Sequence, residues 1–305
     1  MRSKHSEQEN LISNRISTST YEPELDYTKK CASYIRMFME DISADFAAEF
    51  SRYGEYGDFF KIKSSDDKLE KLLNFIDYSF LSDKFSQLLS NNMRSLMLNG
   101  QCFVEIASHL NKDNALKGIS FHLFSSRFYL SINGKTTFFD KDYKENNKIW
   151  TIPNERLIKL DLKELGIERD YFQKIIKKLP SCEIDYPLPP YIQSFEEEEK
   201  IKSLKLTKTV GRTYWDMGSL NNNYITEFYL VYRIFQFNVF RKKFLDYFIE
   251  KYNKALNDIG RQYNFSGEII FNCRNFGSAH DIEKLTIGNI NCEKMGDLLL
   301  GKNNL

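Results

Sequence analysis

The chain has 305 residues, of which 42% are hydrophobic and 15% aromatic, and it carries 43 Lys and Arg against 42 Asp and Glu. This length allows one large domain or two ordinary ones, and the composition excludes a disordered or fibrous chain. The near-zero net charge also excludes a global basic excess of the kind that attracts nucleic acid or anionic lipid, so any contact with DNA must come from a local patch.

The cysteines and the apolar runs indicate the compartment. The five cysteines are odd in number, widely spaced and without a CxxC motif, which favours reduced core thiols in a cytoplasmic protein over disulfides or a zinc site. No apolar run approaches the roughly 20 residues that cross a bilayer, and the N-terminus lacks the apolar middle of a signal peptide. We therefore expect no membrane partner and no export.

Helical spacing dominates the first hundred residues after a polar arm. Residues 1–24 are rich in Ser, Thr and Asn and have no periodic apolar face, so we expect a mobile arm. Apolar residues then recur at steps of three and four in three segments, which predicts three helices. The segments are CASYIRMFMEDISADFAAEF, SSDDKLEKLLNFIDYSF and DKFSQLLSNNMRSLMLNG. Gly100 is expected to end the last helix as its C′ residue.

The next sixty residues change to the two-residue period of strands. CFVEIA, SFHLFS, RFYLSING and KTTFFD alternate or nearly alternate, and Asn133-Gly134 between two of these runs is a strong hairpin signal. KIWTIPNERLIKLDL adds a strand or a strand pair, with Pro153 at an edge or a turn. We predict a small, mostly antiparallel sheet. Helical character returns at 162–179, so residues 25–179 are predicted to form one helix-plus-sheet domain.

Prolines and a charged run mark residues 180–222 as a connector. LPSCEIDYPLPPY is followed by FEEEEKIKSLKLTKTVGR, in which the four glutamates are interpreted as a solvated helix start rather than a metal site. This segment also contains a basic patch beside two aromatic residues, which could follow a phosphate backbone. A solvated loop that neutralises the glutamates is the alternative. The candidate nucleic-acid contacts are Lys202, Lys205, Lys208 and Arg212.

Residues 223–305 predict a long amphipathic helix, then a strand and a short helix. No Pro or Gly interrupts the chain from Asn223 until Gly260, and at 1.5 Å per residue such a helix would be roughly 57 Å long. It must therefore pack on several elements or on a partner chain. SGEIIF predicts the strand and 292–300 the short helix, which completes an α+β fold. The aromatic residues predicted as an oligomer interface are Phe228, Tyr232, Phe235, Phe240, Phe244 and Phe248.

Signals for catalysis are sparse. The four histidines lack familiar ligand spacings, and the chain has no GxxxxGK[ST], no GxGxxG after a strand and no GxSxG. We predict no catalytic residue, metal or cofactor. One alternative stays open, because Asp140 and Asp142 would place two carboxylates on one face of a strand, as a metal-dependent nuclease needs to hold Mg²⁺.

Residues 28–162 resemble the N-terminal half of tailed-phage portal proteins in the order of their features. A helix, a helix pair, a G-x-a-[FY]-[VL]-E-I strand, a hairpin and an I-P-x-x-x-[LIV]-I-[KH]-[LI] strand follow one another in that family. Here the two strand motifs are matched by Gly100–Ile106 and Ile152–Leu160. The chain departs from the family in having no Pro at the Phe124-Ser125-Ser126 turn and no Gly-Ser-Pro-like segment after the second motif.

The resemblance implies a structural, non-enzymatic subunit of a virion. Such subunits form a ring, commonly of twelve copies, whose channel passes double-stranded DNA during packaging and ejection and which contacts the terminase, the capsid and the head-tail connector. The long helix would then pack in the stem or wing against the neighbouring subunit. Near-neutral charge is compatible, because a channel through which DNA slides should not bind phosphates tightly. The alternative is a cytoplasmic interaction module of bacterial or mobile-element origin, for example in phage defence.

Overall fold

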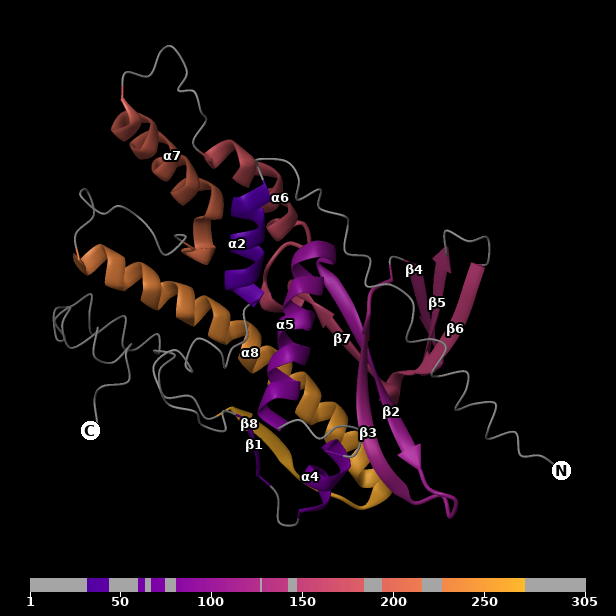
Figure 1. Cartoon of the computed structure of the whole chain (residues 1–305). Helices are drawn as coiled ribbons and strands as arrows, with labels where there is room; N and C mark the ends of the chain where they lie inside the picture. Colours follow the sequence, from indigo (N-terminus) through magenta and orange to yellow (C-terminus); the bar gives the residue numbers. More distant parts are fainter. Residues whose placement is uncertain are drawn as a thin grey trace, which may run out of the picture.

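The computed structural model contains helices and three antiparallel sheets, which confirms the predicted α+β class (Figure 1). One of these sheets is central, and the longest helix runs along it. The structure describes residues 32–43, 60–63, 67–74, 81–126, 128–141, 147–183, 194–215 and 227–271. The predicted arm at 1–24 and the predicted short helix at 292–300 lie outside these ranges.

In the described ranges, three helices precede the central sheet, as predicted. They are α2 (Ala32–Ser43), α4 (Lys68–Leu73) and α5 (Leu81–Asn99), and their apolar stripes are buried in the main core. Gly100 follows α5 with a φ of +73° and donates its N–H to the carbonyl of Leu96 at 2.8 Å. Because a left-handed residue at this position satisfies a free helix carbonyl, Gly100 is the predicted C′ residue.

The central sheet has the order β3-β2-β7. Strand β2 (Gln101–Leu110) lies between β3 (Leu116–Phe124) and β7 (Leu157–Asp161), with both pairings antiparallel. Alternate residues of β2 such as Val104 and Ile106 are buried in the main core, which also contains α5 and α8. The helices thus cover one face of this sheet and leave the other face to a second sheet.

That second sheet is β4-β5-β6, so the single predicted sheet is divided in two. It consists of β4 (Phe128–Ile132), β5 (Lys135–Lys141) and β6 (Asn147–Pro153). Asn133 and Gly134 both have positive φ, at 50° and 73°, as a type I′ hairpin requires. The predicted hairpin is confirmed, and a 3-10 turn at Asn154–Arg156 leads from β6 into β7.

A two-stranded sheet pairs a strand from the first part of the chain with a strand from the last described segment. Strand β1 (Phe60–Lys63) pairs with β8 (Glu268–Phe271). The SGEIIF prediction is therefore confirmed, whereas β1 was not predicted. Asn253 of the long helix fixes β8, because its side chain accepts from the N–H of Ile269 at 2.8 Å and donates to its carbonyl at 2.9 Å.

Helices return after the central sheet. A 3-10 turn at Leu162–Leu165 is followed by α6 (Tyr171–Lys178), a turn at Leu179–Cys182, α7 (Phe195–Val210) and a turn at Gly211–Thr213. Helix α7 lies in the segment predicted as a connector. Ser194 caps this helix, because its hydroxyl accepts a hydrogen bond from the N–H of Glu197 at 3.2 Å. Acidic residues in the first turn interact favourably with the helix dipole.

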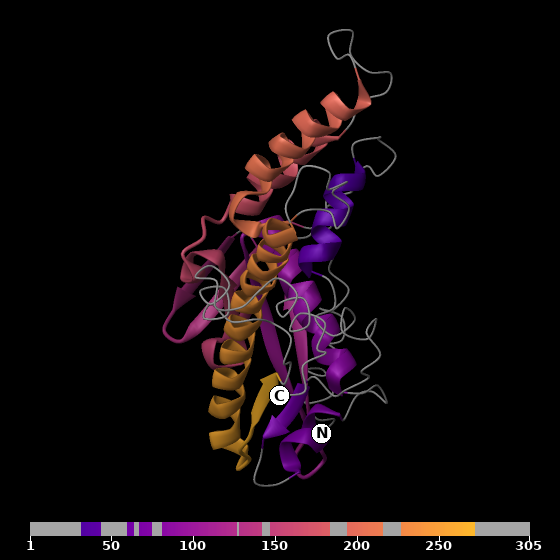
Figure 2. The same ribbon diagram turned by 90° about the vertical axis from the view of Figure 1, so that its left-hand side faces the viewer.

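The longest helix is α8 (Glu227–Tyr263), as predicted, although it continues past Gly260. A Cβ at Gly260 would lie 2.5 Å from the carbonyl oxygen of Phe265, so glycine here permits the chain to fold back toward β8. Figure 2 shows α8 running along the molecule, with α7 near one end of it and β1 and β8 near the other. The main core includes residues from Phe38 to Ile269 and thus from both sides of the predicted connector.

Candidate functional site

The outward face of the β4-β5-β6 sheet is unusually apolar. Phe128, Leu130 and Ile132 alternate along β4 and project from the same side of the sheet. The register places Phe128 beside Phe139 of β5, and Phe139 beside Ile149 of β6. We call these five side chains the apolar sheet face. Their exposed fractions are 70% for Phe128, 53% for Leu130, 56% for Ile132, 41% for Phe139 and 64% for Ile149.

Aromatic packing on the inward face fixes the orientation of this sheet. Phe138 of β5 is fully buried, and its ring lies 4.9 Å from Phe103 of β2 and 4.9 Å from Phe124 of β3. Trp150 of β6 stacks on Phe138 at 5.6 Å. Since neighbouring residues of a strand point to opposite faces, these contacts direct the alternate residues, including all five of the apolar sheet face, outward.

An exposed surface of this kind is characteristic of binding. An antiparallel sheet that faces water on one side normally carries polar residues there. The five side chains instead expose on the order of 500 Å² of apolar surface, comparable to the largest patch on a typical monomer. Among the side chains that the structure describes, three polar ones share the face: Lys135, and Thr137 and Thr151, whose hydroxyls are hydrogen-bonded at 2.9 Å. A flat, apolar face with few charges suits a macromolecular partner.

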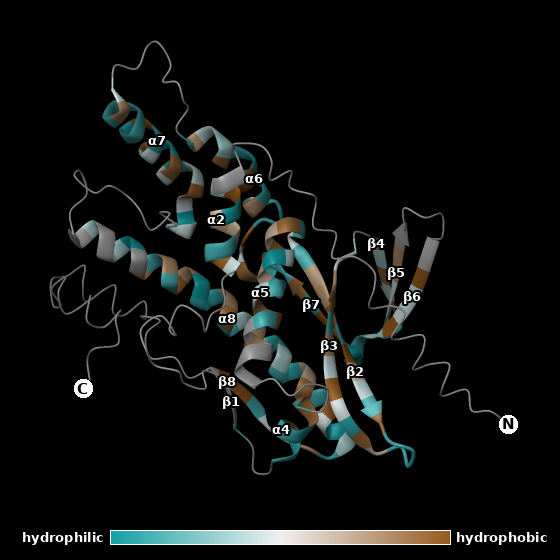
Figure 3. Cartoon of the chain, in the orientation of Figure 1, coloured by the Kyte–Doolittle hydropathy of each residue, from teal (hydrophilic) through white to brown (hydrophobic). Residues whose placement is uncertain are grey.

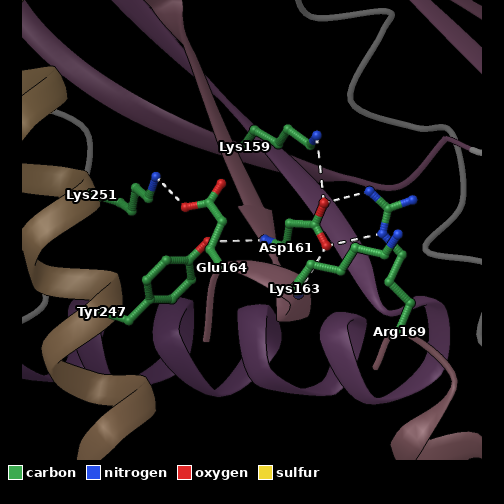
Figure 4. Close-up of polar contacts among 7 residues, drawn as sticks. All are labelled: Lys159, Asp161, Lys163, Glu164, Arg169, Tyr247 and Lys251. Carbon is green, nitrogen blue, oxygen red and sulfur yellow. Dashed lines mark hydrogen bonds and ion pairs between the residues drawn. The ribbon is translucent and has the colours of Figure 1, made fainter. Parts of the chain in front are cut away.

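A polar cluster at the end of β7 joins the central sheet to α8 and to the segment that precedes α6 (Figure 4). Asp161 is buried and accepts hydrogen bonds from Arg169, at 2.9 Å from Nε and again from Nη2, and from the N–H of Lys163 at 3.1 Å. The ammonium of Lys159 lies 3.5 Å from the same carboxylate. The main-chain N–H of Asp161 donates to the hydroxyl of Tyr247 on α8 at 2.9 Å.

This cluster is suited to structure rather than to proton transfer. Burial alone would raise the pKa of Asp161, but the hydrogen bonds from Arg169 and from the Lys163 amide outweigh it, so the pKa lies below its usual range. A carboxylate that is buried, paired and held ionised is a poor general base at neutral pH. Gly100 closes the cluster from the other side, because a Cβ there would meet the carbonyl oxygen and Cβ of Arg169.

A row of polar side chains crosses β2 and β3. Nε2 of His109 lies 2.8 Å from the hydroxyl of Ser120, which lies 2.9 Å from Nε2 of His122. Burial, and then the nearby His109, lower the pKa of His122. Among the residues that the structure describes, no three His, Cys, Asp or Glu side chains are placed to hold a metal ion.

The predicted nucleic-acid contacts are only partly on the surface. Lys205 and Lys208 of α7 and Arg212 just after it are exposed. Lys202 points inward instead, where its ammonium lies 3.4 Å from the buried Glu198 and its side chain is only 15% exposed. Lys202 is therefore removed from the candidate set. Glu198 is likewise not part of a solvated run, because it lies on the side of α7 that faces the core.

The structure corrects the predicted oligomer interface on α8 at three of its six residues. Phe235, Phe244 and Phe248 are each at most 1% exposed, so their side chains are already buried within the chain. Tyr232 and Phe240 are half-buried, and the side chain of Phe228 lies outside the described part. The physical reason is that α2, α5, α6 and the central sheet together supply enough apolar surface to cover these three residues.

Two further points concern residues singled out from the sequence. Asp140 belongs to β5, but its side chain and the whole of Asp142 lie outside the described residues. Sequence reasoning missed the apolar sheet face, although a signal existed. In RFYLSI the large apolar residues occupy both faces of a single strand, which a half-solvated strand does not require.

Comparisons with known proteins add no assignment. The chain matches no protein-family profile, and a search of curated proteins found no match. None of the helices in the described ranges is both long and apolar enough to cross a membrane.

Proposed function

We propose that this chain is the subunit of a portal-like ring that passes double-stranded DNA during packaging and ejection of a phage genome. The observation that carries the proposal is the relation between the two motifs of the resemblance. Gly100–Ile106 opens β2 directly after α5, and Ile152–Leu160 runs through the end of β6 into β7. Strands β2 and β7 are neighbours, with Cys102 opposite Leu160 and Val104 opposite Ile158.

The motif residues have structural reasons to be where they are, which supports the proposal beyond residue composition. The glycine of the first motif adopts a left-handed conformation and approaches Arg169 too closely for any side chain. The proline of the second motif, Pro153, ends β6 and leads into a 3-10 turn. Both motifs thus specify a junction between elements, and these junctions determine how β2 and β7 meet.

Surface properties are compatible with this role. A ring subunit needs an apolar contact surface, and the apolar sheet face supplies one. A DNA channel needs few strong phosphate contacts, since each neutralised phosphate adds affinity through counterion release. The chain has a net charge of only +1. On α7, Lys205 is exposed and could contact a passing duplex.

Native mass spectrometry and negative-stain imaging of the purified chain test the proposal. We expect closed rings of one predominant subunit number with a central channel wide enough for duplex DNA. A chain that stays monomeric over the whole micromolar range would contradict the proposal. A stable complex with one host protein, with each chain present once, would instead favour the second candidate, an interaction module that uses the apolar sheet face to bind a single partner.

A further inference from the structure

A second exposed apolar surface lies on α7. Helix positions four, seven and eleven residues apart share one side of a helix, and on this side Glu197, Ile201, Leu204 and Lys208 are all exposed. We call these four residues the α7 outer face. Ile201 is 46% and Leu204 58% exposed, whereas Leu206 and Val210 on the opposite side are buried in the core. Figure 3 shows hydrophobic residues interspersed with hydrophilic ones along α7.

The two surfaces lie on opposite sides of the molecule. In Figure 1, α7 is at the upper left and the β4-β5-β6 sheet is at the right, with the core helices and the central sheet between them. Within one molecule the two surfaces therefore cannot cover each other. Two different contact surfaces on opposite sides of one subunit are what a head-to-tail assembly requires, because each subunit then binds one neighbour through each surface.

We propose that the α7 outer face of one copy packs on the apolar sheet face of the next copy. A helix laid on a sheet is one of the basic layered arrangements of protein cores, and here the outer layer of the sheet is missing within the chain. The inference specifies the subunit contact of the proposed ring. Only the closure of this contact into a ring depends on the proposed function.

The charges at one end of the two surfaces are complementary. Lys135 is an exposed charged residue at one end of the outward-facing positions of β5. The α7 outer face begins with Glu197, and the exposed Glu196 precedes it. Placing the first turn of α7 near Lys135 brings Ile201 and Leu204 over the rows of the apolar sheet face. Opposite charges at the rim of an apolar contact fix its register more than they add to its affinity.

The available area favours a second copy as the partner. The apolar sheet face exposes on the order of 500 Å². With a polar rim of Lys135, Thr137 and Thr151 it approaches the roughly 800 Å² that each partner buries in a stable interface. The chain itself carries a helix with an exposed apolar side and an acidic first turn, so every copy that is made brings one surface of each kind.

Three substitutions test the contact in the full-length chain. Leu130→Glu places a charge on the apolar sheet face, and Leu204→Glu places one on the α7 outer face. Leu110→Glu is the matched control, because Leu110 is also exposed, at 38%, but lies on neither surface. Circular dichroism and thermal unfolding confirm that each variant is folded, and mass photometry then gives the distribution of assemblies.

We expect the wild type and Leu110→Glu to form assemblies, while Leu130→Glu and Leu204→Glu each weaken assembly roughly a hundredfold or more, since a buried unpaired charge is costly. The decisive measurement is a mixture of Leu130→Glu and Leu204→Glu. Each variant keeps one intact surface, so the mixture should form a complex of one copy of each and nothing larger. This result also shows that both variants are folded and competent.

Other outcomes overturn the inference. If Leu204→Glu assembles like the wild type while Leu130→Glu does not, the sheet packs on something other than α7. If neither variant changes the assembly, or if the wild type does not assemble, neither surface binds a second copy. Rings that survive both substitutions would refute this contact but leave the proposed function standing. Head-to-tail filaments or dimers that both substitutions abolish would support the contact and contradict the portal-like ring.

Discussion

Replacement of Gly100 by Ala is expected to destabilise the fold much more than the same replacement at Gly166. Both glycines have left-handed backbone, with φ of +73° and +70°, and an L-residue there costs about 1 to 2 kcal/mol. At Gly166 a Cβ would have nothing within 4 Å. At Gly100 it would lie 2.6 Å from the Cβ of Arg169 and also meet the Arg169 carbonyl oxygen, so the backbone must move.

The overpacking adds about 1 to 3 kcal/mol at Gly100. The total loss in the free energy of unfolding is therefore about 2 to 5 kcal/mol for Gly100→Ala, against about 1 to 2 kcal/mol for Gly166→Ala. Urea unfolding followed by tryptophan fluorescence measures both, since the buried Trp215 reports on the main core. Equal losses for the two variants would refute the close approach of Gly100 to Arg169 as the reason for glycine in the first motif.

Three further predictions, one of them with a control substitution, concern the polar contacts. Arg169→Ala leaves the buried Asp161 carboxylate without its main partner and should lower the free energy of unfolding by about 2 to 3 kcal/mol. This loss is smaller than for a fully buried pair, because Arg169 is partly exposed. The control Lys174→Ala, which breaks only exposed ion pairs, should have little effect in the same urea titration. His122 has a lowered pKa in the folded chain, so below about pH 6.5 the unfolded chain takes up a proton that the folded chain does not. The free energy of unfolding should therefore decrease as the pH is lowered. In His122→Gln this part of the pH dependence should disappear, and an unchanged pH dependence would exclude His122 as its source. Tyr252→Phe removes the hydroxyl that accepts a hydrogen bond from the buried Asn92 at 2.8 Å, and it should lower the free energy of unfolding by about 1 to 2 kcal/mol. A melting temperature equal to that of the wild type would mean that Asn92 finds another partner.

Local signals predicted most of the elements. The end of α5 at Gly100 and the type I′ turn at Asn133-Gly134 follow from backbone preferences that only a few residue types satisfy. The long helix α8 follows from the spacing of its aromatic residues together with the absence of Pro and Gly before Gly260. In each of these cases the information lies within a few turns of the chain, where sequence and conformation are directly linked.

Long-range pairing could not be predicted in the same way. The four residues of β1 are too few to show a strand pattern, and their partner β8 lies far away in the sequence, in the last described segment. The division of the strands into two sheets depends on the edge-to-face packing of Phe103 and Phe124 against Phe138, which the alternation of each strand does not reveal. Likewise, the basic spacing of α7 does not show that Lys202 turns toward Glu198.

The candidate site shows why an abundance of aromatic residues was a misleading guide to the contact surface. A helix with an apolar stripe can be covered by its own chain, and the stripe of α8 is, because the core closes around Phe244 and Phe248. A strand with apolar residues on both faces sets a stricter condition, since one cover can bury only one face. In β4 the inward Tyr129 packs on Phe103, while Phe128 and Leu130 point outward. On our proposal the second cover is α7 of a neighbouring copy, which exposes Ile201 and Leu204 and has an acidic first turn. The prediction of an oligomer thus moves from α8 to the apolar sheet face, where single substitutions at exposed positions can test it without disturbing the core.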